Sequence, residues 1–172
     1  KILSMLPNAS IDPGATDYNH YFFLMSLVHV EILFNIGAWE DCLDVGYRVL
    51  NVVNQANLSA LKPDYLTEEQ FEAIVMDTIA YVALCNVLQL KGNVQEFLNI
   101  VRTDLTNVPH SFDIFIALQD MIFGRIPKYD RSMVSDNDKF SGVIFHIIEA
   151  FMRCRHDYNV FAEEVYEAKI LA

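Results

Sequence analysis

Apolar residues recur at three- and four-residue intervals along most of the chain, and this period is typical of helices rather than strands. The spacing predicts seven helices, over residues 18–36, 39–53, 68–91, 94–105, 111–123, 138–155 and 158–170. The stretches that lack the period are an extended lead-in at 1–16 and a loop at 124–138. The predicted fold class is therefore all-α, and we expect residues 1–172 to form a single helical domain of a larger protein.

The first two predicted helices differ in the placement of their polar residues. Apolar side chains cover nearly every face of helix 18–36, and a helix of this kind is usually packed between neighbours. Helix 39–53 is amphipathic, and its apolar face is formed by Trp39, Leu43, Gly46, Leu50 and Val53. We therefore expect the first helix to be buried on all sides and the second to lie in an outer layer.

Several residues predict where the helices begin and end. Gly37 and Gly92 supply the unhindered backbone that a helix needs where it ends at a tight corner. Thr67 followed three residues later by Gln70 is a capping-box pattern, which starts the helix over 68–91. Ser111 is placed to cap the helix over 111–123.

The corner at Gly37 recurs in weaker form at Gly92. The first copy reads NIGAWEDCL over residues 35–43, with an aromatic residue, Trp39, after the glycine and a small residue, Cys42, three positions later. Each copy joins a long apolar helix to a shorter amphipathic one. Such units cannot bury their apolar faces alone, so they are expected to stack.

This corner resembles that of the tetratricopeptide repeat (TPR) family, in which a glycine, an aromatic and a small residue recur. The resemblance implies antiparallel helical hairpins stacked as a short, TPR-like right-handed superhelix that binds other proteins. The chain is a divergent member of this pattern, because the interval from Gly37 to Gly92 exceeds the family's repeat of roughly 34 residues. It also lacks the lysine, asparagine and arginine set with which chaperone-binding members hold a terminal carboxylate.

Composition narrows the class of partner. Hydrophobic residues make up 53 % of the chain, which leaves apolar surface for a partner unless the helices bury nearly all of it. The 23 acidic residues outnumber the 12 basic ones, so the formal charge is −11 and binding to nucleic acid is disfavoured. The same charge favours a basic protein partner.

The cysteines and the lengths of the apolar runs indicate the cellular compartment in which the protein is expected. Cys42, Cys85 and Cys154 lie far apart in apolar helical patterns, which is typical of small buried side chains rather than a disulfide framework. We therefore expect an intracellular protein, cytoplasmic or nuclear. The longest apolar runs fall short of the roughly 18 to 20 residues that a membrane span needs, so no membrane span is predicted.

No set of residues predicts catalysis or a cofactor. His146 and Glu149 form an H-x-x-E pair on one helical face, but a zinc site needs further ligands that the pattern does not supply. Cys154 and His156 do not face each other on a helix, so they do not form a nucleophile and its base. We therefore expect no enzyme activity, no metal and no cofactor.

The resulting hypothesis is a non-catalytic scaffold or docking module that binds a protein partner or another domain of its own chain. Polar residues on the otherwise apolar inner helices are the candidate partner-binding residues: His20, Tyr21, His29, Asn35, Tyr81 and Asn86. One alternative is a regulatory or sensory helical module of a signalling or ATPase protein that binds a ligand in an interhelical pocket. Two further alternatives are a helical enzyme domain and a homo-oligomer formed through the last helix.

Overall fold

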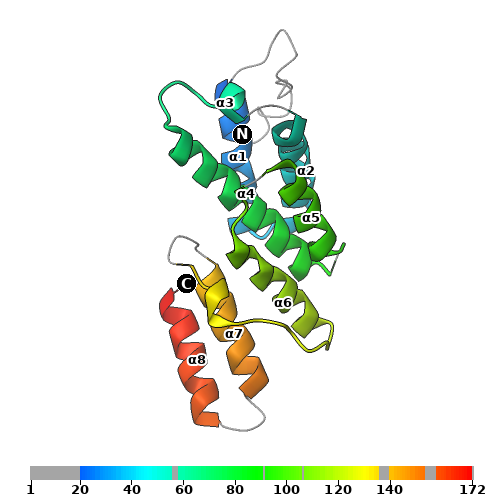
Figure 1. Ribbon diagram of the computed structural model, residues 1–172, viewed down its shortest axis with the longest axis vertical. Helices are drawn as coiled ribbons and strands as arrows, with labels where there is room; N and C mark the ends of the chain where they lie inside the picture. The colour runs from blue at the N-terminus through cyan, green and yellow to red at the C-terminus, as the bar shows by residue number, and fades with distance from the viewer. Residues whose placement is uncertain are drawn as a thin grey trace. The chain divides into compact units, whose positions relative to one another are not determined.

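The computed structural model describes residues 20–55, 58–90, 92–105, 107–135, 140–153 and 158–171. Every regular element within these ranges is helical, so the predicted all-α class is confirmed (Figure 1). By their internal contacts the residues divide into two compact units, Lys1–Lys91 and Gly92–Ala172.

Unit 1 is built from three helices that all pack against one another. These are α1 (His20–Asn35), α2 (Trp39–Gln55) and α4 (Glu68–Leu88) (Figure 1). In the chain, a single helical turn, α3 (Leu58–Leu61), comes between α2 and α4. The core of this unit is mostly apolar, and its largest fully buried side chains are Phe23, Leu27, Leu61, Phe71 and Ile79. Burial of side chains of this size is the main source of stability for such a unit.

Helix α4 packs on both α1 and α2, and it is buried on almost every side from Thr78 to Val87. It begins with the predicted capping box: Thr67 accepts the backbone N–H of Gln70, and Gln70 accepts the backbone N–H of Thr67. Among the described helices, α4 alone is long and apolar enough to cross a membrane by length and composition, and 61 % of its most apolar window is buried. A buried core helix has the same composition.

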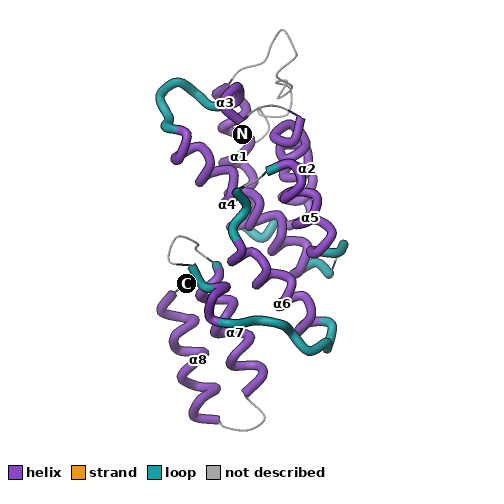
Figure 2. Tube along the Cα trace, in the orientation of Figure 1, coloured by secondary structure: helices purple, strands orange, loops and turns teal. Residues whose placement is uncertain are grey.

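Unit 2 is a chain of helices, each packed against the next. Its elements are α5 (Val94–Asp104), η2 (His110–Phe112), α6 (Asp113–Ile122), η3 (Arg131–Met133), α7 (Ser141–Arg153) and α8 (Tyr158–Leu171) (Figure 2). Helix α5 contacts α6, α6 contacts α7, and α7 contacts α8. The buried Gln119 of α6 ties the first pair together, because its side chain accepts the N–H of Val94 and donates to the carbonyl of Gly92.

The backbone φ angles confirm the corners that the sequence predicts at Gly37 and Gly92. Gly37, Gly92 and Gly124 have φ angles of 75°, 71° and 71°, in the left-handed region that favours glycine. At the first corner the N–H of Ala38 donates to the carbonyl of Leu33, which satisfies one of the free carbonyls at the end of α1.

Three predictions about individual elements were wrong. The seven predicted helices leave no element between α2 and α4, yet this stretch contains α3, because a single turn is too short to show a helical period. Helix α4 ends at Leu88, earlier than predicted, since Leu90 already has a φ of 54°. Ser111 does not cap α6, because it lies inside the 3₁₀ turn η2 that leads into that helix.

Of the two predicted non-helical stretches, the structure describes only the second, and that one in part. The lead-in at 1–16 lies outside the described residues. The predicted loop at 124–138 is non-helical apart from the short 3₁₀ turn η3, and its residues 136–138 also lie outside the described part.

Candidate protein-binding surface

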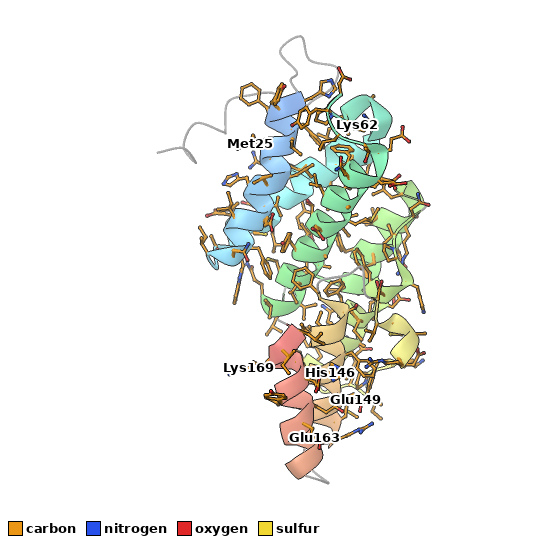
Figure 3. The ribbon with its side chains drawn as sticks, turned by 90° about the vertical axis from the view of Figure 1, so that its left-hand side faces the viewer. Met25, Lys62, His146, Glu149, Glu163 and Lys169 are labelled. Atoms are coloured by element: carbon orange, nitrogen blue, oxygen red, sulfur yellow. The ribbon has the colours of Figure 1, made fainter. Side chains whose placement is uncertain are left out.

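Helix α1 carries a line of exposed apolar side chains on the face that does not pack in unit 1. Phe22, Met25 and Ile32 lie on one face of α1, and Ile36 continues the line in the turn that follows the helix. With His29 between them, the residues are three and four positions apart. These four side chains are between 38 % and 64 % exposed. We call these five residues the α1 stripe. Figure 3 shows its Met25 on the outer side of α1.

The stripe shows that the expected burial of α1 on all sides was wrong. Helix α1 is covered by α2 and α4 within unit 1, and these two neighbours bury a second face, formed by Phe23, Leu27, Val30 and Leu33. Two helices can cover only part of a third, so an apolar residue on the far side stays exposed. The all-round apolar pattern therefore arises from a core face together with a separate surface face.

Aromatic contacts hold α1 in place against α4. The ring centroids of Phe23 and Phe71 lie 6.2 Å apart, and those of Phe34 and Tyr81 lie 4.9 Å apart. Pairs at these separations add attraction beyond the area that they bury. The α1 stripe is thus displayed on a helix whose opposite face is packed at two points along its length.

A pair of tyrosines widens the apolar surface at the start of α1. The ring of Tyr21 stacks on that of Tyr65, with centroids 5.8 Å apart and planes inclined by 23°. Tyr65 lies in the turn after α3, where Lys62 Nζ donates to the carbonyl of Leu66 at 2.8 Å (Figure 3). His20 Nδ1 also lies 3.0 Å from the carbonyl oxygen of Leu61, so α3 and the turn that follows it are held near the start of α1.

His29, in the middle of the stripe, is favoured in its neutral form. Its pKa lies below the usual 6.5, mainly because burial disfavours the imidazolium and also because Arg48 is nearby. Asp41 opposes this shift in part. At pH 7 the imidazole is therefore uncharged, and the centre of the α1 stripe carries no charge of its own.

Two of the sequence-predicted partner-binding residues are used inside unit 1. Tyr81 is buried, and its hydroxyl donates to Glu31 Oε1 at 2.9 Å. Burial and this carboxylate raise the pKa of Tyr81. Asn86 is also buried: its Oδ1 accepts from the Tyr47 hydroxyl at 2.9 Å. Polar side chains of this kind satisfy one another in the core.

The other four predicted residues lie along α1. His20 and Tyr21 are exposed at its start, Asn35 is exposed at its end, and His29 is half-buried in the stripe. The structure thus brings these four onto one helix and places Tyr81 and Asn86 in the interior. Whether any of the six contacts a partner stays a prediction.

Sequence reasoning missed the four apolar members of the α1 stripe. Their three- and four-residue spacing is visible in the sequence, but the apolar residues on the other faces of the same helix hide it. The helix has almost no amphipathic character, so the pattern could not show which of its apolar faces is covered.

A cluster of charged and polar side chains joins α7 to α8 in unit 2. His146 Nδ1 lies 2.5 Å from Glu164 Oε2, and Glu149 pairs with Arg153 at 2.5 Å. Arg153 also reaches to 4.0 Å from Glu164. Burial and a hydrogen bond to Glu149 raise the pKa of Tyr129 to about 12. Figure 3 shows His146 and Glu149 on the same helix, as their spacing predicts.

The side chains of this cluster contact one another. Glu164 of α8 reaches His146 and Arg153 of α7, so this carboxylate joins the two helices, whereas Glu149 pairs with Arg153 along α7 itself. Across the described residues, no group of three or more His, Cys, Asp or Glu side chains is placed to hold a metal ion.

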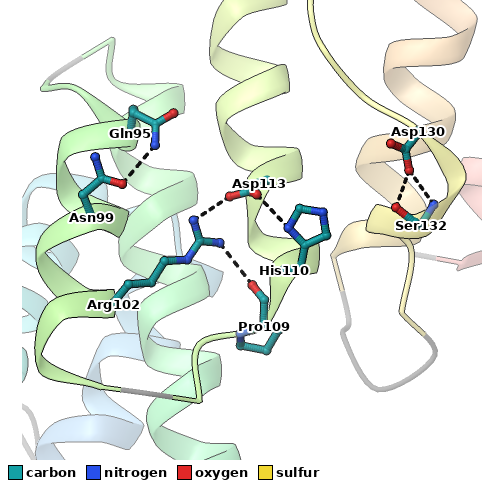
Figure 4. A network of polar contacts seen from close by, with 8 residues as sticks. All are labelled: Gln95, Asn99, Arg102, Pro109, His110, Asp113, Asp130 and Ser132. Carbon is teal, nitrogen blue, oxygen red and sulfur yellow. Dashed lines mark hydrogen bonds and ion pairs between the residues drawn. The ribbon is translucent and has the colours of Figure 1, made fainter.

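A second polar network fixes the turn between α5 and α6. Arg102 pairs with Asp113 at 2.7 Å and donates to the carbonyl of Pro109 at 3.3 Å (Figure 4). His110 Nδ1 lies 2.8 Å from the other carboxylate oxygen of Asp113. In the nearby turn η3, Asp130 accepts from the backbone N–H of Ser132. These contacts orient the connection between α5 and α6 and the turn η3.

Comparison of the chain with protein-family models, curated proteins and solved structures finds no match. Packing within unit 1 does not explain the α1 stripe, since exposed apolar side chains in a continuous line gain nothing from contact with water.

Proposed function

We propose that the chain is a non-catalytic protein-interaction module, and that the α1 stripe is the surface on which it binds a basic, amphipathic helix of a partner protein. The observation that carries this proposal is the alignment of Phe22, Met25, Ile32 and Ile36 along one face of α1 and the turn that follows it. Exposed apolar residues in a line, rather than scattered singly, are typical of surfaces that bind proteins.

The length of the stripe suits a helix as the partner. Phe22 and Ile36 are fourteen residues apart, which corresponds to about 21 Å at the rise of an α-helix. A partner helix that lies along this line presents about four turns, with apolar anchors at positions i, i+3, i+4 and i+7. The Tyr21–Tyr65 pair extends the apolar area at one end and offers a flat surface for another anchor.

Charge favours a basic partner. The chain carries a formal charge of −11, and α2 exposes Glu40, Asp41 and Asp44. Arg48 and Asp41 both act electrostatically on His29, so charges of both signs lie near the stripe, and it is the net negative charge of the chain that favours a basic partner. Charges at the rim of such a surface increase the association rate with an oppositely charged partner and select against acidic ones.

The arrangement of helices that supports this function is proposed to be TPR-like. The α1–α2 hairpin turns at Gly37 with the backbone expected of that repeat, and α2 places Cys42 and Gly46 against the helices that it covers. The alternative of a ligand bound in an interhelical pocket, as in a regulatory module of a signalling or ATPase protein, stays a prediction.

A binding measurement with defined peptides tests the proposal. The probe is a synthetic helix with leucines at i, i+3, i+4 and i+7 and lysines elsewhere, and fluorescence anisotropy records its binding to the full chain. We expect Met25→Glu and Ile32→Glu each to weaken binding roughly tenfold, because each places a charge in an apolar contact. The matched control is Ile100→Glu, which changes an exposed isoleucine of α5 in unit 2.

The proposal fails if the basic helix does not bind the unmodified chain. It also fails if Ile100→Glu weakens binding as much as the two α1 variants do. A peptide with the same leucines and glutamates in place of lysines separates the role of charge, since it should bind more weakly than the basic peptide.

A further inference from the structure

Cys42 of α2 and Cys85 of α4 meet in the interior of unit 1. Both are free thiols, and neither has any exposed surface. They lie within one turn of the contact between Gly46 of α2 and Val82 of α4, and the two thiols are close enough to influence each other's ionisation. The thiol of Cys42 also lies 3.5 Å from the carbonyl oxygen of Val30 in α1. The two sulfur atoms are therefore neighbours although they are far apart in the sequence.

The backbone geometry explains why the thiols come so close. A Cβ atom added to Gly46, one turn after Cys42, would lie 2.3 Å from Cγ2 of Val82, three residues before Cys85. Glycine at this position therefore lets α2 approach α4 more closely than any other residue would allow. The pairs 42–85 and 46–82 run in opposite directions along the two helices, as in antiparallel packing.

We propose that Cys42 and Cys85 are a modification site, at which a peroxide oxidant forms an intramolecular disulfide that locks α2 onto α4. This inference does not depend on the proposed binding function. It rests on two buried thiols on two different helices, one turn from the point where Gly46 lets α2 approach Val82 of α4 closely.

The chemistry balances with hydrogen peroxide as the oxidant. A cysteine thiolate attacks one peroxide oxygen and breaks the O–O bond, which gives a sulfenic acid and a hydroxide that takes up the proton lost by the thiol. The second thiol then attacks the sulfenic sulfur, and the S–O bond breaks as the S–S bond forms. Two thiols and one peroxide thus become one disulfide and two waters.

The two thiols are equally buried, so either can attack the peroxide, and the other then resolves the sulfenic acid. Because both sulfurs are buried, the reaction requires an opening of unit 1 that admits a molecule about the size of water.

The test uses the full chain with Cys154→Ser, which removes the third thiol. The folded protein is treated with hydrogen peroxide, the free thiols are blocked, and the digest is analysed by mass spectrometry without reduction. We expect a peptide pair linked through residues 42 and 85, lighter than the sum of its parts by two hydrogen atoms and separated by reductant. The oxidised protein should also unfold at a higher temperature than the reduced one, because the link constrains the unfolded chain.

Two kinds of variant test the proposal: single cysteine substitutions, and substitutions at Gly46 and Val82 that change the spacing of α2 and α4. Cys42→Ser and Cys85→Ser should each abolish the linked peptide. Gly46→Ala should slow its formation by separating the helices, and Gly46→Ala with Val82→Ala should restore the rate, since the second change removes the methyl group that would clash. The proposal is wrong if the folded protein yields no 42–85 peptide, or if Cys42 is oxidised to the sulfinic acid while Cys85 stays a free thiol.

Discussion

The α1–α2 hairpin of unit 1 and the α7–α8 hairpin of unit 2 are held by different forces. The first is held by apolar packing on α4, with Phe23, Val30 and Cys42 fully buried. The second has ion pairs across and along its helices, His146 with Glu164 and Glu149 with Arg153. Apolar packing responds weakly to pH and salt, whereas ion pairs respond to both. The two hairpins should therefore fail under different conditions.

The largest expected effect is in the apolar hairpin. Phe23→Ala should lower the free energy of unfolding by about 3–5 kcal/mol, because it leaves a cavity in the fully buried contact with Phe71. The matched control is Phe22→Ala, one residue away in the exposed α1 stripe, which should change it by less than about 0.5 kcal/mol. Urea unfolding followed by circular dichroism measures both. If both variants lose the same free energy of unfolding, Phe22 and Phe23 do not lie on an exposed and a buried face of α1.

A smaller effect is expected in the charged hairpin. Glu164→Gln should lower the free energy of unfolding by about 1–3 kcal/mol, because it leaves a mostly buried His146 without its carboxylate. Glu163→Gln changes the exposed neighbour on the same helix, and we expect it to stay within about 0.5 kcal/mol of the unmodified chain. If the two variants unfold alike in urea, the cluster does not hold α7 to α8.

The starts of α4 in unit 1 and α6 in unit 2 differ as well. The capping box opens α4, whereas α6 begins without any side-chain cap. Thr67→Ala should therefore lower the free energy of unfolding by about 1 kcal/mol. The control is Ser26→Ala, which removes only a hydroxyl that bonds back to the Phe22 carbonyl within α1. Thermal unfolding of both variants gives the comparison, and a larger loss for Ser26→Ala would contradict it.

Alkaline pH should act on unit 2 through Tyr129. The pKa of this residue is raised from 10.0 to about 12, so the folded state favours the protonated hydroxyl. Its contribution to stability is full below pH 10 and is lost as the pH rises through 12. Melting temperatures between these values should fall less steeply for Tyr129→Phe than for the unmodified chain. If the melting temperatures of the two proteins fall with pH at the same slope, Tyr129 is not the cause of the pH dependence.

Mild acid should act on unit 1 through His29, with the smallest effect. Because its pKa lies below 6.5, the neutral imidazole is favoured in the folded state, and its contribution is present above pH 6.5 and lost as the pH falls below that value. His29→Gln should flatten the pH dependence of the melting temperature between neutral and mildly acidic pH. A variant with the slope of the unmodified chain would refute the assignment.

Much of the architecture could be predicted from the sequence, because the signals are local. The corner at Gly37, the capping box at Thr67 and the buried side of α5, formed by Phe97, Leu98 and Val101, all follow from residues a few positions apart. The turn α3 could not be predicted, since a single turn has no period to detect. The cap at Ser111 failed because the chain enters α6 through a 3₁₀ turn.

The α1 stripe could not be predicted from residues that are close together in the sequence. The sequence by itself determined that α1 is a helix, apolar on nearly every face, and that α2 is amphipathic. Only the tertiary structure decided which face of α1 is covered by α2 and α4 and which is left as the α1 stripe. Likewise, only the packing of α2 on α4 brought Cys42 to Cys85. The physical reason is that helical periodicity arises between residues three and four apart, whereas burial depends on neighbours that are distant in the chain.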